Sequence, residues 1–84
     1  MSDSKPVCQM VKNSRELIKF SLGEYQGHNF IDMRIFALTG EEDRTIPTKR
    51  GLAVSPALWP EFKKALAQLE EAMIKEGWLE DLGE

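Results

Sequence analysis

The 84-residue sequence has few of the residues on which catalytic, metal-binding and disulfide-stabilised proteins depend. Cys8 is the only cysteine, so no internal disulfide can form. His28 is the only histidine, and one cysteine with one histidine excludes a Cys/His zinc site within a single chain. No Gly-rich phosphate loop and no metal-ligand spacing occurs. We therefore expect no catalytic residues, no metal and no cofactor.

Long apolar runs are missing as well. No stretch approaches the roughly 20 apolar residues that a membrane span requires. Residues 1–12 carry an acid at Asp3 and no apolar segment of the kind that a signal peptide contains. We expect a protein without a membrane partner, placed in the cytoplasm or associated with the nucleoid in a bacterium.

A chain of this length has limited means of stabilising itself. A domain this small buries only about 60% of the surface that its unfolded chain exposes. Because no disulfide is available, self-association is the expected additional source of stability. The sequence therefore favours a homodimer.

An excess of positive charge is also missing, since the formal net charge is −3. The charge is unevenly distributed, however. Residues 61–84 contain seven acids and three bases, whereas residues 1–60 contain seven acids and eight bases. Three of those seven acids are adjacent, at residues 41–43. One basic face is therefore compatible with the negative total, because steering of a charged partner depends on where the charge lies.

Two-residue alternation begins at Leu17 and predicts strands. Ile18, Phe20 and Leu22 alternate with polar or small residues, as in a half-buried strand. The segment 30–38 alternates in the same way and is expected to pair with the first strand through a short hairpin. Shorter strands are predicted at 44–48 and 52–54. Residues 1–14 show no sustained periodicity and are expected to form a flexible arm.

A helix is predicted after the strands. Ser55 is a favourable N-cap and Pro56 suits the first helical position. Pro60 is tolerated only if it lies in the first turn, so the helix is expected to begin near Leu58. Gly77 ends it, and residues 77–84 form an acidic tail. The predicted fold is α+β, with a ββββα protomer whose antiparallel four-stranded sheet is covered on one face by the C-terminal helix, in a domain spanning residues 15–76.

One side of this helix is apolar and can serve two purposes. Its residues recur at spacings of three and four, which suits packing on the sheet or a seam with a second helix. Trp78 follows the helix, and an exposed tryptophan would be unfavourable in a monomer. The predicted dimer-interface residues are Trp59, Phe62, Leu66, Leu69, Met73 and Trp78.

The polar face of the predicted sheet suggests a binding surface. Aromatic rings that alternate with cations suit single-stranded nucleic acid, because bases stack on the rings and cations contact phosphates. Two further cations precede Gly51, where the backbone can approach a phosphate closely. In the alternative interpretation, the aromatic residues are partly buried surface residues and the two cations lie in an ordinary solvated turn. Asp32, the one acid on this face, is expected to be a structural partner of Arg34 or of a neighbouring strand rather than a general base. On these grounds the candidate nucleic-acid-binding residues are Lys19, Tyr25, Arg34, Phe36, Lys49 and Arg50, whereas His28 is expected to be a turn residue.

Three segments in this order resemble the C-terminal domain of the transcriptional coactivator p15, also called positive cofactor four. They are the run Phe30-Ile31-Asp32-Met33-Arg34, the segment Lys49-Arg50-Gly51-Leu52-Ala53-Val54-Ser55-Pro56, and Trp59 three residues later. The resemblance covers about residues 15–75. It implies a ββββα protomer that dimerises through helices and strands, with two curved sheets that form a channel for single-stranded or melted DNA.

The resemblance also implies roles for individual positions. Tyr25 matches an aromatic residue that stacks on bases, and Arg34 matches an arginine of the second strand. His28 replaces a lysine, which makes it a seventh candidate nucleic-acid-binding residue. Lys49 and Arg50 match the basic pair before the glycine, and Phe36 lies near a base-stacking position. Ala37 falls where the family can carry a tryptophan, so this substitution and the one at His28 are expected to weaken binding. Without a Ser- and Lys-rich region before the domain, the chain resembles a compact bacterial or phage-type member.

The favoured interpretation is sequence-tolerant binding of single-stranded DNA by a dimer, in transcription, replication or repair. Two alternatives remain open at this point. One is a protein-interaction adaptor that contacts RNA polymerase or another regulator through the sheet or the acidic tail. The other is an RNA binder, because stacking surfaces do not by themselves exclude RNA.

Overall fold

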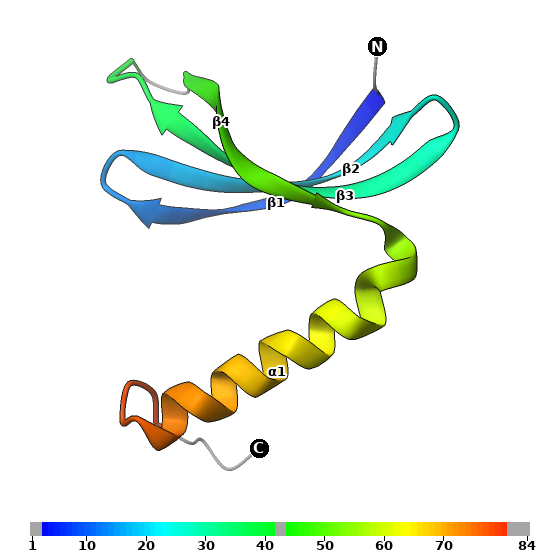
Figure 1. The fold of residues 1–84 in the computed structure, drawn as a ribbon. Coiled ribbons are helices and arrows are strands. Elements are labelled where there is room, and N and C mark those ends of the chain that lie inside the picture. Colours follow the sequence, from blue (N-terminus) through cyan, green and yellow to red (C-terminus); the bar gives the residue numbers. More distant parts are fainter. Residues whose placement is uncertain (1–2, 42–43, 81–84) are drawn as a thin grey trace.

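The computed structural model describes residues 3–41 and 44–80. Four antiparallel strands form one sheet in the order β1-β2-β3-β4, and one helix follows them (Figure 1). This confirms the predicted order of four antiparallel strands and a C-terminal helix. Part of the predicted acidic tail, residues 81–84, lies outside the described residues. The elements are β1 (Asp3–Asn13), β2 (Glu16–Tyr25), β3 (His28–Leu38), β4 (Thr45–Val54), the 3-10 turn η1 (Pro56–Leu58) and α1 (Trp59–Lys75).

The first strand corrects one prediction. Residues 3–13 were expected to belong to a flexible arm, but they form β1, which pairs with β2 along its length. The pairing shifts between Pro6 and Cys8 and again between Val11 and Asn13. Each shift changes which side of the sheet the following residues face, so no single alternation runs through the segment. The polar, Pro-containing sequence of β1 therefore does not show the period of two that marks β2 and β3.

The hairpin of β2 and β3 forms as predicted. Tyr25 pairs with His28, and Gln26 and Gly27 form the two-residue turn between them. Both turn residues have positive φ, at 52° and 82°, which matches the twist of the flanking strands. The pairing then continues without a shift as far as Glu16 and Ala37. This unbroken register is what makes the side-chain alternation of these two strands regular.

The strands predicted at 44–48 and 52–54 are one strand, β4. It pairs with β3 on both sides of an irregularity that falls between Arg34 and Phe36. Gly51 lies opposite Arg34 with φ 146°, and a methyl group there would be 2.5 Å from the carbonyl oxygen of Met33. Glycine is therefore required where β4 crosses close to β3.

The helix begins and ends where the sequence indicates. Ser55 Oγ accepts a hydrogen bond from the backbone N–H of Ala57 at 3.3 Å and caps η1. Pro60 lies in the first turn of α1, where its missing N–H leaves no helical hydrogen bond unmade. Beyond the last turn, Gly77 has φ 81°, which allows the chain to leave the helix.

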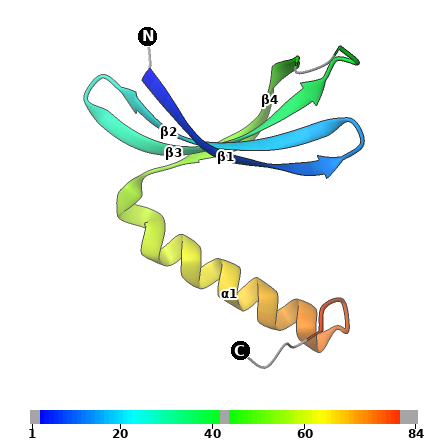
Figure 2. The same ribbon diagram turned by 180° about the vertical axis from the view of Figure 1, so that it is seen from behind.

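The position of α1 corrects a second prediction. The helix was expected to cover one face of the sheet, but no residue of α1 is buried. Figures 1 and 2 show α1 running below the sheet and away from it after η1. Among the described residues, the buried apolar side chains are Leu17 and Val54, and alternation along β2 and β4 places them on opposite faces. One chain therefore does not form a shared core between sheet and helix.

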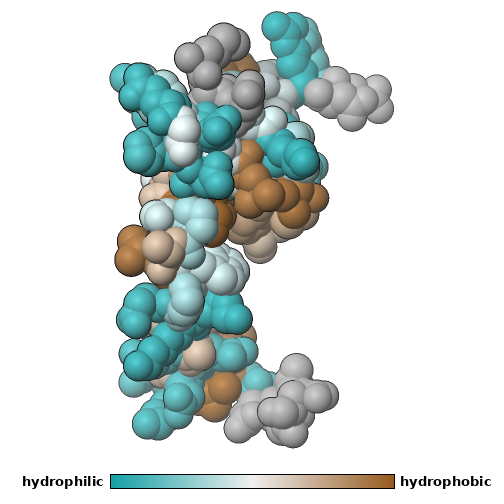
Figure 3. All heavy atoms as spheres, turned by 90° about the vertical axis from the view of Figure 1, so that its right-hand side faces the viewer, coloured by the Kyte–Doolittle hydropathy of each residue, from teal (hydrophilic) through white to brown (hydrophobic). Residues whose placement is uncertain are grey.

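The two faces of the sheet differ in shape and composition. The strand ends rise away from the helix, so the face opposite α1 is concave (Figures 1 and 2). We call the other side the apolar face, and Figure 3 shows apolar residues gathered there, between the sheet and the helix. Alternation assigns Lys19, Ser21, Gly23, Tyr25, His28, Phe30, Asp32, Arg34 and Phe36 to the concave face, and Ile18, Phe20, Leu22, Ile31, Met33, Ile35, Leu52 and Val54 to the apolar face.

Candidate nucleic-acid interface

The register of β2 and β3 brings distant candidate residues together on the concave face. Lys19 pairs with Arg34, and Leu17 pairs with Phe36 two positions further along the strands. At the other end of the hairpin, Tyr25 pairs with His28. Five of the seven predicted nucleic-acid-binding residues therefore lie along two adjacent strands on one face.

Lys19 is positioned by two neighbours. Its Nζ lies 4.4 Å from the centroid of the Phe36 ring and donates a hydrogen bond to Thr45 Oγ1 at 3.0 Å. The first contact is a cation–π interaction, which holds the ammonium over one face of the ring. None of the ion pairs formed by the described residues includes Lys19. Its positive charge is thus available to a phosphate, whereas a base can stack on this face of Phe36 only after Lys19 moves.

Arg34 is held more firmly. Its Nη2 and Nε donate to the two carboxylate oxygens of Asp32 at 3.2 and 3.5 Å, and its Nη1 donates to the carbonyl of Thr48 at 3.4 Å. The side chains of Arg34 and Asp32 are 31% and 21% exposed. Asp32 is therefore a structural partner of Arg34, as predicted. We call this pair, in which two guanidinium nitrogens donate to two carboxylate oxygens, the Asp32–Arg34 fork. It fixes the plane of the guanidinium, and the carboxylate offsets part of the positive charge.

A groove on the concave face has a wall that the sequence did not predict. Its volume is about 380 Å³. β1 contributes Pro6, Val7 and Gln9, which line the groove together with the candidate side chains of β2 and β3. Residues 3–13, which were predicted to be a flexible arm, therefore form one side of this groove as β1. The lining residues are Ser4, Pro6, Val7, Cys8, Gln9, Lys19, Phe20, Ser21, Asp32, Arg34 and Phe36.

The turn end of the hairpin is open. Tyr25 is 51% exposed, and its hydroxyl accepts a long hydrogen bond of 3.4 Å from Gln26 Nε2. His28 is also exposed. The phenol ring of Tyr25 is therefore the most accessible of the predicted stacking groups.

Sequence reasoning missed Phe30. It pairs with Gly23 on the concave face, between the turn and the Asp32–Arg34 fork. The tip of its ring lies over Gly23, so that a methyl group on the glycine would be 2.6 Å from Cε2. The available signal was the pairing of an aromatic residue with a glycine across a predictable hairpin, which lets a ring lie across the neighbouring strand.

Arg50 is not placed with the other cations. Its Nη1 donates a hydrogen bond to Glu16 Oε2 at 2.6 Å. Glu16 alternates with Ile18 and so belongs to the side of the apolar face. Lys49 is exposed on β4, next to the irregularity. The basic pair therefore does not continue the row formed by Lys19 and Arg34.

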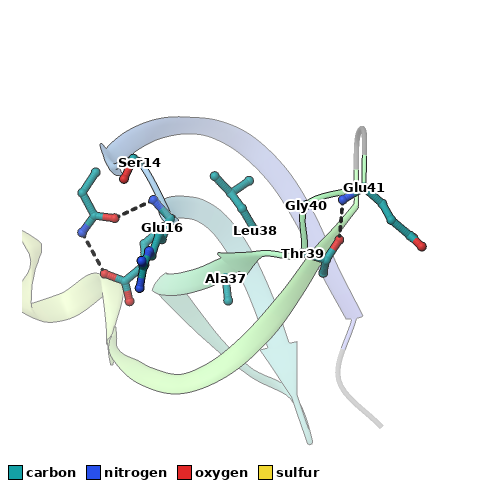
Figure 4. Close-up of a pocket in the computed structure, with 9 residues that line it drawn as sticks. Ser14, Glu16, Ala37, Leu38, Thr39, Gly40 and Glu41 are labelled. Atoms are coloured by element: carbon teal, nitrogen blue, oxygen red, sulfur yellow. Dashed lines mark hydrogen bonds between the residues drawn. The ribbon is translucent and has the colours of Figure 1, made fainter.

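The carboxylate that holds Arg50 is itself well supported. Glu16 accepts a hydrogen bond from Lys12 Nζ at 2.9 Å. It accepts a second from Asn13 Nδ2 at 3.0 Å, which is drawn in Figure 4. These two bonds and the charge of Arg50 lower the pKa of Glu16 to about 2. The same close-up shows Ala37 and Leu38 pointing to opposite sides of the sheet. This polar cluster ties the β1–β2 turn to β4.

The predicted dimer-interface residues lie on or just beyond α1. Trp59 and Phe62 stack with ring centroids 5.7 Å apart. Leu66 is 47% exposed and Leu69 58% exposed, and Trp78 is 74% exposed. Met73 is half-buried. A groove of about 390 Å³ separates the start of the helix from the end of β4, and it is lined by Leu52, Ala53, Val54, Leu58, Glu61 and Phe62.

Within residues 3–41 and 44–80, no group of three or more acidic, histidine or cysteine side chains could hold a metal ion. In the same part of the chain, no helix is both long and apolar enough to cross a membrane.

Comparison with solved structures supports the fold. The chain is similar to BPSL1147, a PC4 homologue from Burkholderia pseudomallei K96243, with a TM-score of 0.71, 20% identity, and coverage of 81% of this chain and 98% of that one. It is also similar to the bacteriophage T5 homologue of the eukaryotic coactivator PC4, which is implicated in recombination-dependent DNA replication. There the TM-score is 0.54, with 20% identity and coverage of 89% and 81%. No curated protein matched.

Comparison with protein families gives the assignment. The family model described as Transcriptional Coactivator p15 (PC4) matches residues 12–65. The matched part includes all of β2, β3 and β4 and the first turns of α1. It contains Lys19, Arg34 and Phe36 of the concave face. This chain therefore belongs to the transcriptional coactivator p15 (PC4) family.

Proposed function

We propose that this protein binds single-stranded DNA along the concave face, as a homodimer and with little dependence on base sequence. The family is one of DNA-binding coactivators without enzymatic activity. The observation that carries the proposal is the row of cations and aromatic rings along β2 and β3, from Tyr25 and His28 to Lys19, Arg34 and Phe36. Cations at this spacing contact phosphates, and rings between them stack on bases without selecting one.

The groove formed with β1 supports a single strand as the ligand. Its volume of about 380 Å³ and its position beside Lys19 and Arg34 suit an unpaired nucleotide. A duplex presents its bases inward, so rings on a concave sheet would meet only its backbone. Stacking therefore favours a strand whose bases are accessible.

Dimerisation is proposed from the side chains that one chain leaves uncovered. No residue of α1 is buried, and Leu66 and Leu69 are about half exposed although they belong to the apolar stripe. A groove lies between the end of β4 and the start of α1, and apolar residues gather between the sheet and the helix (Figure 3). A second copy supplies complementary apolar surface of the same composition, and burial of such surface is the main favourable term in association. The proposed interface residues are those of the apolar stripe of α1, together with Trp78. The stripe consists of Trp59, Phe62, Leu66, Leu69 and Met73.

The biological setting is proposed from the same surface. A sequence-tolerant single-strand binder suits transcription, replication or repair, where duplex DNA is opened. The phage T5 homologue is implicated in recombination-dependent DNA replication, which fits this range. RNA and a protein partner such as RNA polymerase are the alternative ligands. Titration against DNA and RNA strands tests RNA directly, and absence of binding to every nucleic acid would favour the protein partner.

The test is a titration of the protein against a labelled 20-nucleotide DNA strand, the matching duplex and an RNA strand, each at several salt concentrations. We expect the DNA strand to bind more tightly than the duplex, with affinity falling steeply as salt rises. Lys19→Ala is expected to weaken binding and to reduce the slope of log K against log salt by about 0.7 per site, the value for one phosphate contact on a single strand.

Lys64→Ala is the matched control, because Lys64 is an exposed lysine of α1 that lies away from the concave face. It should leave both affinity and slope unchanged. Absence of binding to every nucleic acid at low salt would refute the proposal and favour the adaptor interpretation. Tighter binding of RNA than DNA would reassign the ligand.

A further inference from the structure

Phe30 differs from the other aromatic residues of the concave face in how its ring is held. It pairs directly with Gly23, which is buried although glycine has no side chain to pack. The cover comes from the Phe30 ring. A methyl group built on Gly23 would meet Cζ first and would lie 2.6 and 2.8 Å from Cε2 and Cε1.

These distances give the orientation of the ring. If the ring met Gly23 edge-on, both Cε carbons would lie clearly further from the methyl position than a carbon at the tip. Both are instead within 2.8 Å, as for a point above the face of the ring near its tip. One face of the phenyl ring therefore lies flat on the backbone of Gly23. Its other face is turned away from the sheet, toward the concave side.

The position of the ring along the strands is favourable for a ligand. Phe30 lies two residues from His28 on the turn side and two residues from Asp32 on the other. It is half-buried, so part of the ring remains accessible. The Phe36 ring, by contrast, has the Lys19 ammonium over one face. On the concave face of β2 and β3, Phe30 thus offers a flat apolar surface between His28 and the Asp32–Arg34 ion pair.

We propose that Phe30, laid flat on Gly23, is a base-stacking platform of this protein. The proposal rests on the proposed function and names a further residue of the same surface. Gly23 is a positioning residue, because any larger side chain would lift the ring from the sheet. The ligand chemistry is an unpaired nucleobase of any kind, since every base has a π-face.

The experiment compares two labelled strands of equal length, one of 20 thymidines and one of 20 abasic sites that keep the phosphates but lack bases. Phe30→Leu keeps apolar bulk but removes the ring, and Phe30→Tyr keeps the ring. We expect Phe30→Leu to weaken binding of the thymidine strand about 5- to 150-fold, the range for one lost stack. Its affinity for the abasic strand should match that of the unsubstituted protein. Phe30→Tyr should bind both strands as the unsubstituted protein does.

Other outcomes separate this proposal from the proposed function. Equal weakening of both strands by Phe30→Leu, or weakening of neither, would overturn the stacking role and leave single-strand binding intact. If the unsubstituted protein binds neither strand, the proposed function itself fails.

A second measurement needs no variant and covers the case in which Phe30→Leu does not fold. In NMR spectra of the unsubstituted protein, the ring protons of Phe30 should shift upfield on addition of the thymidine strand and not of the abasic strand. The same shift with both strands, or no shift with either, would refute the proposal. Gly23→Ala, which displaces the ring, should lose affinity for the thymidine strand selectively.

Discussion

Glu16 shows how one residue can hold two separate parts of the chain. Its carboxylate accepts hydrogen bonds from Lys12 and Asn13 at the end of β1 and forms an ion pair with Arg50 of β4. Together these lower its pKa to about 2, from an ordinary value of 4.5. Because the folded-state pKa is below the unfolded one, ionised Glu16 contributes stability above about pH 4.5. That contribution is lost as the pH falls toward 2.

We therefore expect Glu16→Gln to make the stability of the folded protein depend less on pH in the acidic range. Between about pH 5 and pH 2, the urea midpoint of the unsubstituted protein should fall more steeply than that of the variant. Glu24→Gln is the control, because Glu24 is an exposed residue of the same strand and forms none of the ion pairs among the described residues. Parallel profiles for Glu16→Gln and the unsubstituted protein would contradict the expectation.

At the scale of elements, the crossing of β3 and β4 depends on a missing side chain. A methyl group on Gly51 would lie 2.5 Å from the carbonyl oxygen of Met33 and 2.8 Å from the Cα of Arg34. Both are backbone atoms, which cannot turn aside as a flexible side chain can. The irregularity in β4 beside Arg34 thus depends on glycine at this position.

Gly51→Ala is expected to destabilise the protein by about 1–3 kcal/mol more than Gly40→Ala, as measured by urea denaturation. Gly40 is the matched control, since it also has a positive φ, at 87°, but an added methyl group there meets no atom within 4 Å. Both variants share the backbone strain, and only Gly51→Ala adds the collision. Equal losses would show that β4 can move away from β3.

How far the sequence predicts these elements depends on whether the alternation is regular. β2 and β3 pair without a shift, so a period of two predicted both strands and the shared face of Lys19, Arg34 and Phe36. β1 has two shifts and a proline, which removed the signal. β4 changes register beside Arg34, so the side on which Arg50 lies could not be read from spacing. The helix was predictable because its start depends on local capping chemistry at Ser55.

The candidate site was predictable to the same extent. Two-residue alternation predicts which residues share one face of a strand, and it placed most of the candidate residues of β2 and β3 on the concave face. The pairing of Phe30 with Gly23 needed the exact hairpin register, and the wall supplied by β1 needed a strand that the sequence conceals. The position of α1 away from the sheet is a property of packing, which local patterns do not determine.

At the scale of the whole molecule, the helix stripe should determine the oligomeric state. Leu69→Asp places a charge among apolar side chains that we propose are buried between protomers, and burial of an unpaired charge is strongly unfavourable. We expect it to convert a dimer to a monomer in analytical ultracentrifugation, with a lower melting temperature and weaker binding of single-stranded DNA.

Gln68→Asp is the matched control for this change. It introduces the same acid one residue earlier, about 100° around the helix, on an exposed position outside the stripe. It should remain dimeric. A monomeric unsubstituted protein, or a dimer that tolerates Leu69→Asp, would contradict the proposed interface.

The separation of Leu17 and Val54 onto opposite faces of the sheet also bears on how the protein comes to be folded. A chain that buries so little on its own has little to gain from ordering before it meets another. For the proposed homodimer, folding and assembly would then be a single event, governed by how often two chains encounter each other. Soon after synthesis, when few copies are present, the chain would remain open to degradation. Its abundance in the cell would thereby set the fraction that is folded and able to bind.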